Sequence, residues 1–135
     1  MAILVVDDER LVCQVVKLAL ARHGLQTIEA HDGPSALAAV REARANISLL
    51  LTDINMPGMN GIELASSITA EFAHIPVLFM SCAVASEKEL NAAVPGSRFI
   101  KKPFVSTMLV QAVKDMCAFA KEGFITGGVK STARA

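Results

Sequence analysis

Short apolar segments of strand length recur along the chain and alternate with stretches of helical spacing. Three of them, at 3–6, 47–51 and 77–80, are almost wholly apolar and rich in branched residues. Two more, at 25–29 and 98–101, mix apolar and polar residues. Strands that are buried on both faces read as continuous apolar runs, whereas edge strands tolerate polar residues. The pattern therefore predicts five strands, with the first, third and fourth inside a sheet and the other two at its edges.

Five segments between and after these runs carry apolar residues at helical spacing. The residues that mark them are Leu11, Val15 and Leu18 (with Val12 and Ala19); Leu37 and Val40; Leu64, Ile68 and Phe72; a weakly patterned segment at 87–94; and Met108, Leu109, Ala112, Val113 and Met116. Strands that alternate with helices predict an α/β fold in which helices cover both faces of a parallel sheet. This fits the flavodoxin-like (βα)5 order 2-1-3-4-5, although periodicity alone leaves the order of the inner strands open.

Length and charge narrow the range of functions. The chain has 135 residues, enough for one domain with a buried core, and 13 Lys and Arg residues balance 13 Asp and Glu residues. No basic stripe favours nucleic-acid binding, and no apolar run approaches the length of a membrane span. The three cysteines, Cys13, Cys82 and Cys117, form no CxxC pair, which favours reduced thiols. Because the start of the chain also lacks the features of a signal peptide, we expect a cytoplasmic location.

The regular pattern stops near residue 120. The residues that follow include Gly123, Gly127, Gly128, Ser131 and Thr132, a composition typical of flexible segments. We therefore predict one domain at 1–120 and a flexible tail or linker at 121–135.

Polar residues follow four of the predicted strands at their carboxyl ends. They are Asp7-Asp8-Glu9 after the first strand, Thr52-Asp53 after the third, Ser81-Cys82 after the fourth and Lys101-Lys102-Pro103 after the fifth. Because ligands of such sheets bind outside the carboxyl ends of the strands, these side chains should meet at one rim. Crowded carboxylate oxygens favour a hard cation, above all Mg²⁺. Together with a hydroxyl and an ammonium group, they suit transfer of a phosphoryl group to a carboxylate.

Each of these features also has a simpler explanation. Asp7 and Asp8 could cap a helix, and Asp53 could belong to the turn that follows it. Ser81 could cap a helix too, and Lys102 could be a surface charge. All four features at matching strand ends favour a functional site over four independent coincidences.

Four segments resemble the signatures of response-regulator receiver domains of two-component signalling, the CheY-like superfamily. They are Val5-Val6-Asp7-Asp8-Glu9; Leu50-Leu51-Thr52-Asp53-Ile54-Asn55-Met56-Pro57-Gly58-Met59-Asn60-Gly61; Pro76-Val77-Leu78-Phe79-Met80-Ser81; and Lys102-Pro103-Phe104. The resemblance implies that Asp53 is the phosphoacceptor. It implies that Asp8, Asp53 and the backbone carbonyl of Asn55 hold Mg²⁺, with Asp7 acting from the second shell or through water.

The resemblance also implies a switch. Ser81 would move onto the phosphoryl oxygen, Lys102 would pair with the phosphoryl group, and Phe99 would rotate. The face formed by the fourth helix, the fifth strand and the fifth helix would then change for a protein partner. The Lys102-Pro103 bond would be cis.

The same resemblance implies partners. A histidine kinase or a histidine phosphotransfer protein would donate the phosphoryl group in a phosphorelay. The domain would not be an enzyme beyond transfer to itself and loss of its own phosphoryl group. It would either stand alone or form part of a larger regulator or hybrid kinase.

Two positions depart from the family pattern. Cys82 follows Ser81 where Ala or Gly is commoner, so we expect altered access of water, and Val94-Pro95-Gly96 replaces a turn of small residues before the fifth strand.

Three rival functions have different requirements. A degenerate receiver that docks constitutively would lack part of the site, which is complete here. A haloacid-dehalogenase-type phosphatase would need Asp at the position of Glu9 and a cap domain, and a nucleotide-binding module would need glycines after the first strand.

Overall fold

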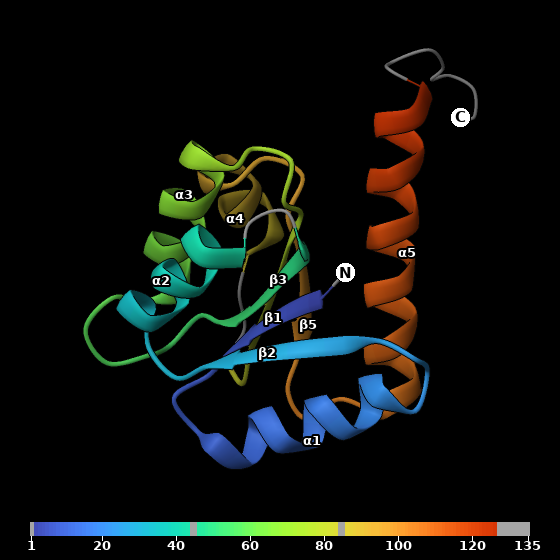
Figure 1. Ribbon diagram of the computed structural model, residues 1–135. Coiled ribbons are helices and arrows are strands. Elements are labelled where there is room, and N and C mark those ends of the chain that lie inside the picture. Colours follow the sequence, from blue (N-terminus) through green and yellow to red (C-terminus); the bar gives the residue numbers. More distant parts are fainter. Residues whose placement is uncertain (1, 44–45, 84–85, 127–135) are drawn as a thin grey trace.

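Five parallel strands form the centre of the molecule (Figure 1). The computed structural model describes residues 2–43, 46–83 and 86–126, with side chains described up to residue 118. The strands are β1 (Ala2–Val6), β2 (Gln26–Ala30), β3 (Ile47–Asp53), β4 (Val77–Ser81) and β5 (Arg98–Lys101). Their order in the sheet is β2-β1-β3-β4-β5. The predicted fold class and strand order are therefore confirmed, with the two strands of mixed polarity at the edges.

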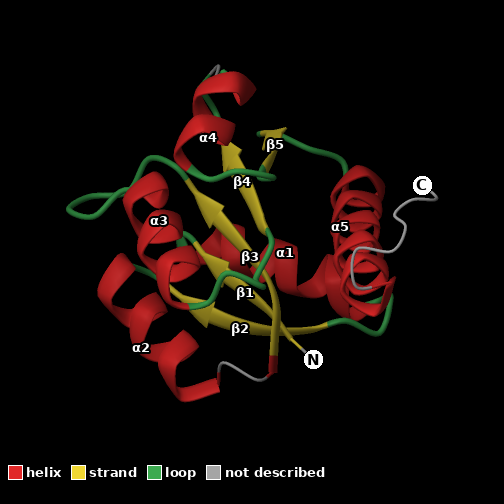
Figure 2. Cartoon of the chain, turned by 90° about the horizontal axis from the view of Figure 1, so that it is seen from above, coloured by secondary structure: helices red, strands yellow, loops and turns green. Residues whose placement is uncertain are grey.

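Helices cover both faces of this sheet (Figure 2). One face carries α1 (Arg10–Ala21) and α5 (Ser106–Thr126), and the other carries α2 (Gly33–Ala43), α3 (Gly61–Glu71) and α4 (Glu87–Ala93). Alternate side chains of the central strands enter the two resulting cores. Leu4 and Leu50 pack on the side of α2 and α3, whereas Val5 and Leu51 pack on the side of α1 and α5. Burial on both faces explains why β1 and β3 read as continuous apolar runs.

The buried face of α1 differs from the stripe that marks this helix in the sequence. Leu11, Val15 and Leu18 are 73%, 54% and 64% exposed. The buried residues of α1 are Cys13, Val16, Ala19 and Leu20. Apolar residues occupy more than one face of this helix, so their spacing predicts a helix correctly but does not decide which face meets the sheet.

The last helix is longer than the predicted domain. Its backbone continues to Thr126, past the expected boundary at residue 120. Helical hydrogen bonds are local, so a helix can extend beyond the point where its residues reach the core. Residues 127–135 of the predicted tail lie outside the described residues. No helix in the described part of the chain is long and apolar enough to cross a membrane.

Candidate functional site

The carboxyl ends of β1, β3 and β4 bring three buried polar side chains to one rim of the sheet. Asp7 directly follows β1 and is fully buried, Asp53 is the last residue of β3 and is 6% exposed, and Ser81 is the last residue of β4 and is 1% exposed. Asp8 comes one residue after Asp7 and is exposed. In a parallel sheet every strand ends at the same edge, which is why residues so far apart in the sequence meet here.

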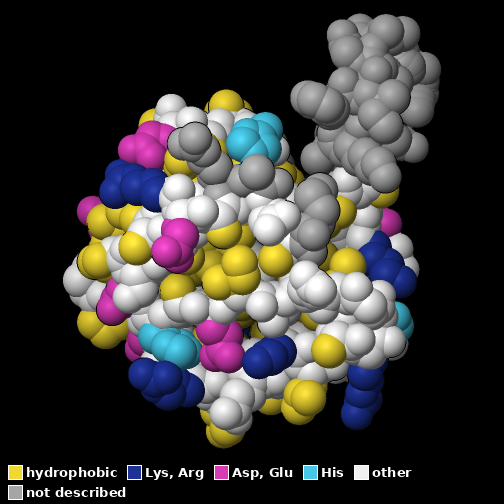
Figure 3. Space-filling model, in the orientation of Figure 1, with side chains coloured by type: hydrophobic (Ala, Val, Ile, Leu, Met, Phe, Trp, Pro, Cys, Tyr) yellow, Lys and Arg dark blue, Asp and Glu magenta, His cyan; other side chains and the backbone are white. Residues whose placement is uncertain are grey.

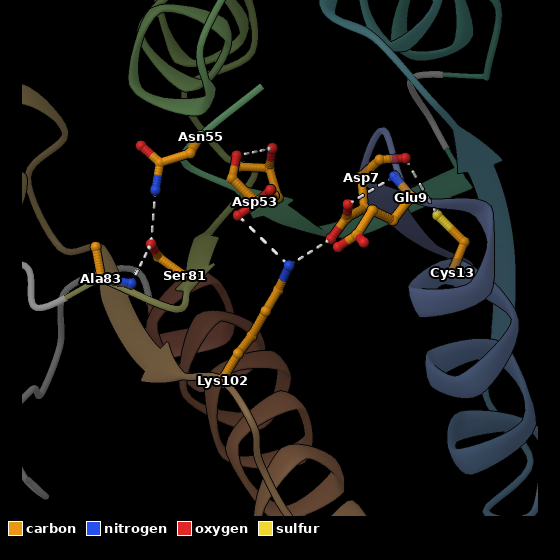
Figure 4. Close-up of polar contacts among 9 residues, drawn as sticks. Asp7, Glu9, Cys13, Asp53, Asn55, Ser81, Ala83 and Lys102 are labelled. Carbon is orange, nitrogen blue, oxygen red and sulfur yellow. Dashed lines mark hydrogen bonds and ion pairs between the residues drawn. The ribbon is translucent and has the colours of Figure 1, made fainter. Parts of the chain in front are cut away.

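Lys102 lies between two of these carboxylates (Figure 4). Its Nζ atom is 2.8 Å from Asp7 Oδ2 and 3.6 Å from Asp53 Oδ1. Burial disfavours the ammonium charge, but the hydrogen bond and charge of Asp7, together with the charge of Asp53, outweigh burial and raise the pKa of Lys102. The ammonium group therefore stays charged and joins the ends of β1, β3 and β5.

Three carboxylates form an acidic rim around this lysine. Oxygen atoms of Asp7, Asp8 and Asp53 lie within 4.8 Å of one another. Burial raises the pKa of Asp53 and the charge of Asp7 adds to this, although the charge of Lys102 opposes it. One ammonium group thus leaves excess negative charge at the rim, which a cation would neutralise. Carboxylate oxygens are the ligands that Mg²⁺ prefers, so the donor set fits this ion.

Ser81 makes contacts that the sequence does not predict. Its hydroxyl oxygen accepts a hydrogen bond from the side-chain amide of Asn55 at 2.9 Å and another from the backbone N–H of Ala83 at 3.1 Å. The family resemblance implies a role only for the backbone carbonyl of Asn55. An Asn in a turn carries no signal that its side chain reaches a residue of the next strand, so only the folded loops reveal this bond.

The start of α3 lies directly against the backbone of Asp53 and Ile54. The backbone N–H of Gly61 donates to the carbonyl of Ile54, and a Cβ atom at position 61 would collide with the carbonyl of Asp53. Asn60 and Glu63 form a capping box that begins the helix at this point. Only glycine at position 61 therefore permits α3 to start so close to the carboxylate.

The remaining predicted residues lie around this centre. Phe99 is half-buried on β5, is paired in register with Phe79 of β4, and packs against the core on the α2–α3–α4 side. Cys82 follows Ser81 and is exposed. The Lys102-Pro103 bond is cis, as predicted. The structure thus brings Asp7, Asp8, Asp53, Ser81 and Lys102 to one rim and places Phe99 on β5, beside the strand that ends with Ser81.

The fold and this rim define the class: a five-stranded α/β domain with a flavodoxin-like strand order and an acidic rim that holds one lysine. Comparison with known proteins gives the family. The family profile described as "Response regulator receiver domain" matches residues 3–114. The chain therefore belongs to the response regulator receiver domain family.

Individual relatives agree with this assignment. The chemotaxis protein CheY of Pseudomonas aeruginosa is 34% identical over 118 residues, which cover 84% of this chain and 94% of that protein. The putative two-component response regulator ARR21 of Arabidopsis thaliana is 37% identical over 110 residues, which cover 81% of this chain. The chain spans only about a fifth of the length of ARR21 and of a second Arabidopsis thaliana regulator, ARR13, at 18% and 22%.

Solved structures show the same fold. The chemotaxis protein CheY4 of Vibrio cholerae superimposes with a TM-score of 0.79 at 28% identity, covering 86% of this chain and 98% of that one. A response regulator receiver domain protein from Clostridium thermocellum superimposes with a TM-score of 0.81 over 90% of this chain and 98% of that one, at 24% identity.

Proposed function

We propose that this receiver domain is a phosphorylation switch in which Asp53 accepts a phosphoryl group. The observation that carries the proposal is the Lys102 ammonium group, which contacts both Asp7 and Asp53. There it would balance the charge that phosphoryl oxygens add to the acidic rim. In the transfer, an Asp53 oxygen forms a bond to phosphorus while the bond from phosphorus to the donor atom breaks. The donor atom keeps the electron pair of the broken bond.

Mg²⁺ is part of this proposal. Asp8, Asp53 and the backbone carbonyl of Asn55 would hold the ion, and Asp7 would act from the second shell or through water. When bound, the ion would supply further positive charge for the phosphoryl oxygens. We propose no enzyme activity beyond transfer of the phosphoryl group to Asp53 and its later hydrolysis.

Labelling with a small phosphodonor tests the acceptor. Incubation with acetyl phosphate and Mg²⁺ should add one phosphoryl group to the wild type, measured by intact mass. Asp53→Asn should abolish the addition. Asp115→Asn, which changes an exposed carboxylate on α5, should leave it intact. Equal labelling of wild type and Asp53→Asn would exclude Asp53 as the acceptor.

The switch would begin at Ser81. Movement of its hydroxyl onto the phosphoryl group would break the bond from Asn55 and draw the loop after β4 inward. Phe99, half-buried on the neighbouring strand, would turn into the space that this movement leaves. Its ring brings no polar group that burial would leave unpaired. The surface of α4, β5 and α5 would then present a different shape to a protein partner.

Amide NMR spectra with and without beryllofluoride test this coupling. We expect shifts that extend from the rim through residues 86–110 in the wild type and that stay near Asp53 in Ser81→Ala. Shifts confined to the rim in the wild type, or full propagation in Ser81→Ala, would contradict the proposed route.

The phosphodonor would be a histidine kinase or a histidine phosphotransfer protein that docks on α1. In the described part of the chain, the large apolar side chains with the greatest exposure are Leu11, Val15 and Leu18 of α1, Val105 just before α5, and Met108 in the first turn of α5. These two helices pack beside each other. Hydrophobic side chains reach the surface along the lower edge of Figure 3, where Figure 1 places α1.

The position of this apolar patch favours the donor as its occupant. α1 begins directly after the acidic rim, and α5 begins shortly after Lys102. A protein that brings a phosphohistidine to Asp53 must cover the elements that surround the rim, and an exposed apolar patch marks an interaction surface. The proposed location of the protein is the cytoplasm, as the three free cysteines predict.

A further inference from the structure

A second group of metal-binding side chains lies between α1 and β2. One possible ligand atom from each of Cys13, Glu29 and His31 lies within 4.8 Å of the other two. Cys13 belongs to the first turn of α1, Glu29 lies on β2, and His31 follows that strand. The packing of α1 against β2 brings these residues together.

The separation of the His31 and Glu29 ligand atoms suits a tetrahedral cation. His31 Nε2 lies 3.2 Å from Glu29 Oε2. This is close to the separation of roughly 3.4 Å between two light-atom ligands of a tetrahedral zinc ion. Cys13 is fully buried, whereas the side chains of His31 and Glu29 are 26% and 28% exposed. The cluster is therefore enclosed on the side of the thiol, and water can reach it on the other side as a fourth ligand.

The ligand chemistry favours a soft divalent ion. Burial, together with the charges of Asp7 and Glu29, raises the pKa of the Cys13 thiol to about 11, so the thiol is neutral while no cation is bound. A coordinating metal deprotonates a thiol and neutralises a neighbouring carboxylate. A thiolate and an imidazole prefer Zn²⁺ to Mg²⁺, which prefers the all-oxygen acidic rim.

We propose that Cys13, Glu29 and His31 form a Zn²⁺ site that is distinct from the acidic rim. On binding, the Cys13 proton leaves to solvent and the sulfur, nitrogen and oxygen atoms bond to the ion. The site adjoins the backbone of Asp7. The backbone N–H of Asp7 donates to the carbonyl of Ala30 at 3.2 Å. The backbone carbonyl of Asp7 accepts from the Cys13 thiol, with its oxygen 3.6 Å from Sγ. A bound ion would therefore join α1 to β2 beside the rim.

Cobalt substitution tests the site directly. The whole chain is titrated with Co²⁺ in saturating Mg²⁺, so that the acidic rim is occupied. A thiolate-to-cobalt charge-transfer band, together with the intense visible bands of tetrahedral cobalt, is expected at one ion per chain. Zn²⁺ should abolish both signals. Absence of the charge-transfer band in the wild type would overturn the proposal.

Variants assign the ligands. Cys13→Ser should remove the charge-transfer band, and His31→Gln and Glu29→Gln should weaken Zn²⁺ binding at least tenfold. Cys82→Ser and His74→Gln change the same residue types at exposed positions and should leave binding unchanged. Because Cys13 lies in the core, the two partly exposed ligands keep the test valid if Cys13→Ser folds poorly. Equal Zn²⁺ affinity in wild type, His31→Gln and Glu29→Gln would overturn the proposal.

Discussion

The side-chain amide of Asn55 donates a 2.9 Å hydrogen bond to the hydroxyl oxygen of Ser81. Asn55 belongs to the loop after β3 and Ser81 ends β4, so the bond joins the loop that follows Asp53, the proposed acceptor, to the proposed switch residue. In the proposed switch, movement of the Ser81 hydroxyl onto a phosphoryl group would break this bond. The bond therefore stabilises the resting arrangement seen here.

Asn55→Ala should favour the state in which Ser81 contacts the phosphoryl group, and so raise the affinity for its analogue beryllofluoride. Asn55 is exposed, and a hydrogen bond of this kind contributes about 1 kcal/mol or less, so its loss should tighten beryllofluoride binding about two- to fivefold. The backbone carbonyl of residue 55 remains for Mg²⁺. Binding is measured by titration followed by NMR.

The control for this prediction is a double-mutant cycle. In a Ser81→Ala background, Asn55→Ala should have no effect on beryllofluoride affinity, because its hydrogen-bond partner is already absent. A similar gain in both backgrounds would show that Asn55 acts through another contact.

Asp53→Asn should stabilise the protein at neutral pH. The folded-state pKa of Asp53 is raised above 3.8, chiefly by burial. As the pH rises through the interval between 3.8 and the folded-state pKa, the unfolded chain releases its proton first, so the stability of the wild type falls. Asparagine does not ionise, so the variant does not lose stability in this way. Its melting temperature should exceed that of the wild type at pH 7 without Mg²⁺, and the difference should disappear as the pH approaches 3.8.

Asp32→Asn provides a control of opposite sign. A hydrogen bond from the backbone N–H of Ser35 lowers the pKa of Asp32, so its carboxylate contributes stability above 3.8 that is lost as the pH falls. This variant should gain nothing at neutral pH. A gain equal to that of Asp53→Asn would show that removal of any carboxylate is sufficient, and would contradict the role of burial.

Mg²⁺ should stabilise the wild type by mass action. At a concentration ten times its Kd the gain in unfolding free energy is about 1.4 kcal/mol, and EDTA should reverse it. Asp8→Ala should lose most of this response. Without Mg²⁺ it should melt higher than the wild type, because it removes repulsion within the acidic rim. An unchanged Mg²⁺ response in Asp8→Ala, measured by thermal melts, would exclude Asp8 as a ligand.

Polar substitutions of the exposed apolar residues on α1 should separate docking of the donor from transfer of the phosphoryl group. Leu11→Gln with Val15→Gln should slow phosphotransfer from a phosphorylated histidine phosphotransfer domain by about tenfold or more. Labelling by acetyl phosphate should not change, because the small donor needs no docking surface. Ala38→Gln, an exposed position of α2 on the opposite face, is the control. Equal slowing with both donors would place the effect in the acidic rim instead of the patch.

The alternation of apolar strands and helices was sufficient to predict the fold class and which strands lie at the edges, but the order of the inner strands rested on the flavodoxin-like fold. Continuous apolar runs identify β1, β3 and β4 as inner strands because both of their faces are buried. The rim residues could be predicted for a related reason. In a parallel sheet, residues at the carboxyl ends of the inner strands lie at one edge, so Asp7 and Asp53 could be placed at the same rim once the strands were recognised.

The sequence by itself thus determined the fold class and the residues that lie at the rim, because both depend on local periodicity and on where each strand ends. Only the tertiary structure decided which face of α1 is buried, because apolar residues lie on more than one face of this helix. The same holds for the Asn55–Ser81 bond and for the cluster of Cys13, Glu29 and His31. Each joins segments whose approach depends on loop paths and helix packing, which no periodicity along the chain encodes.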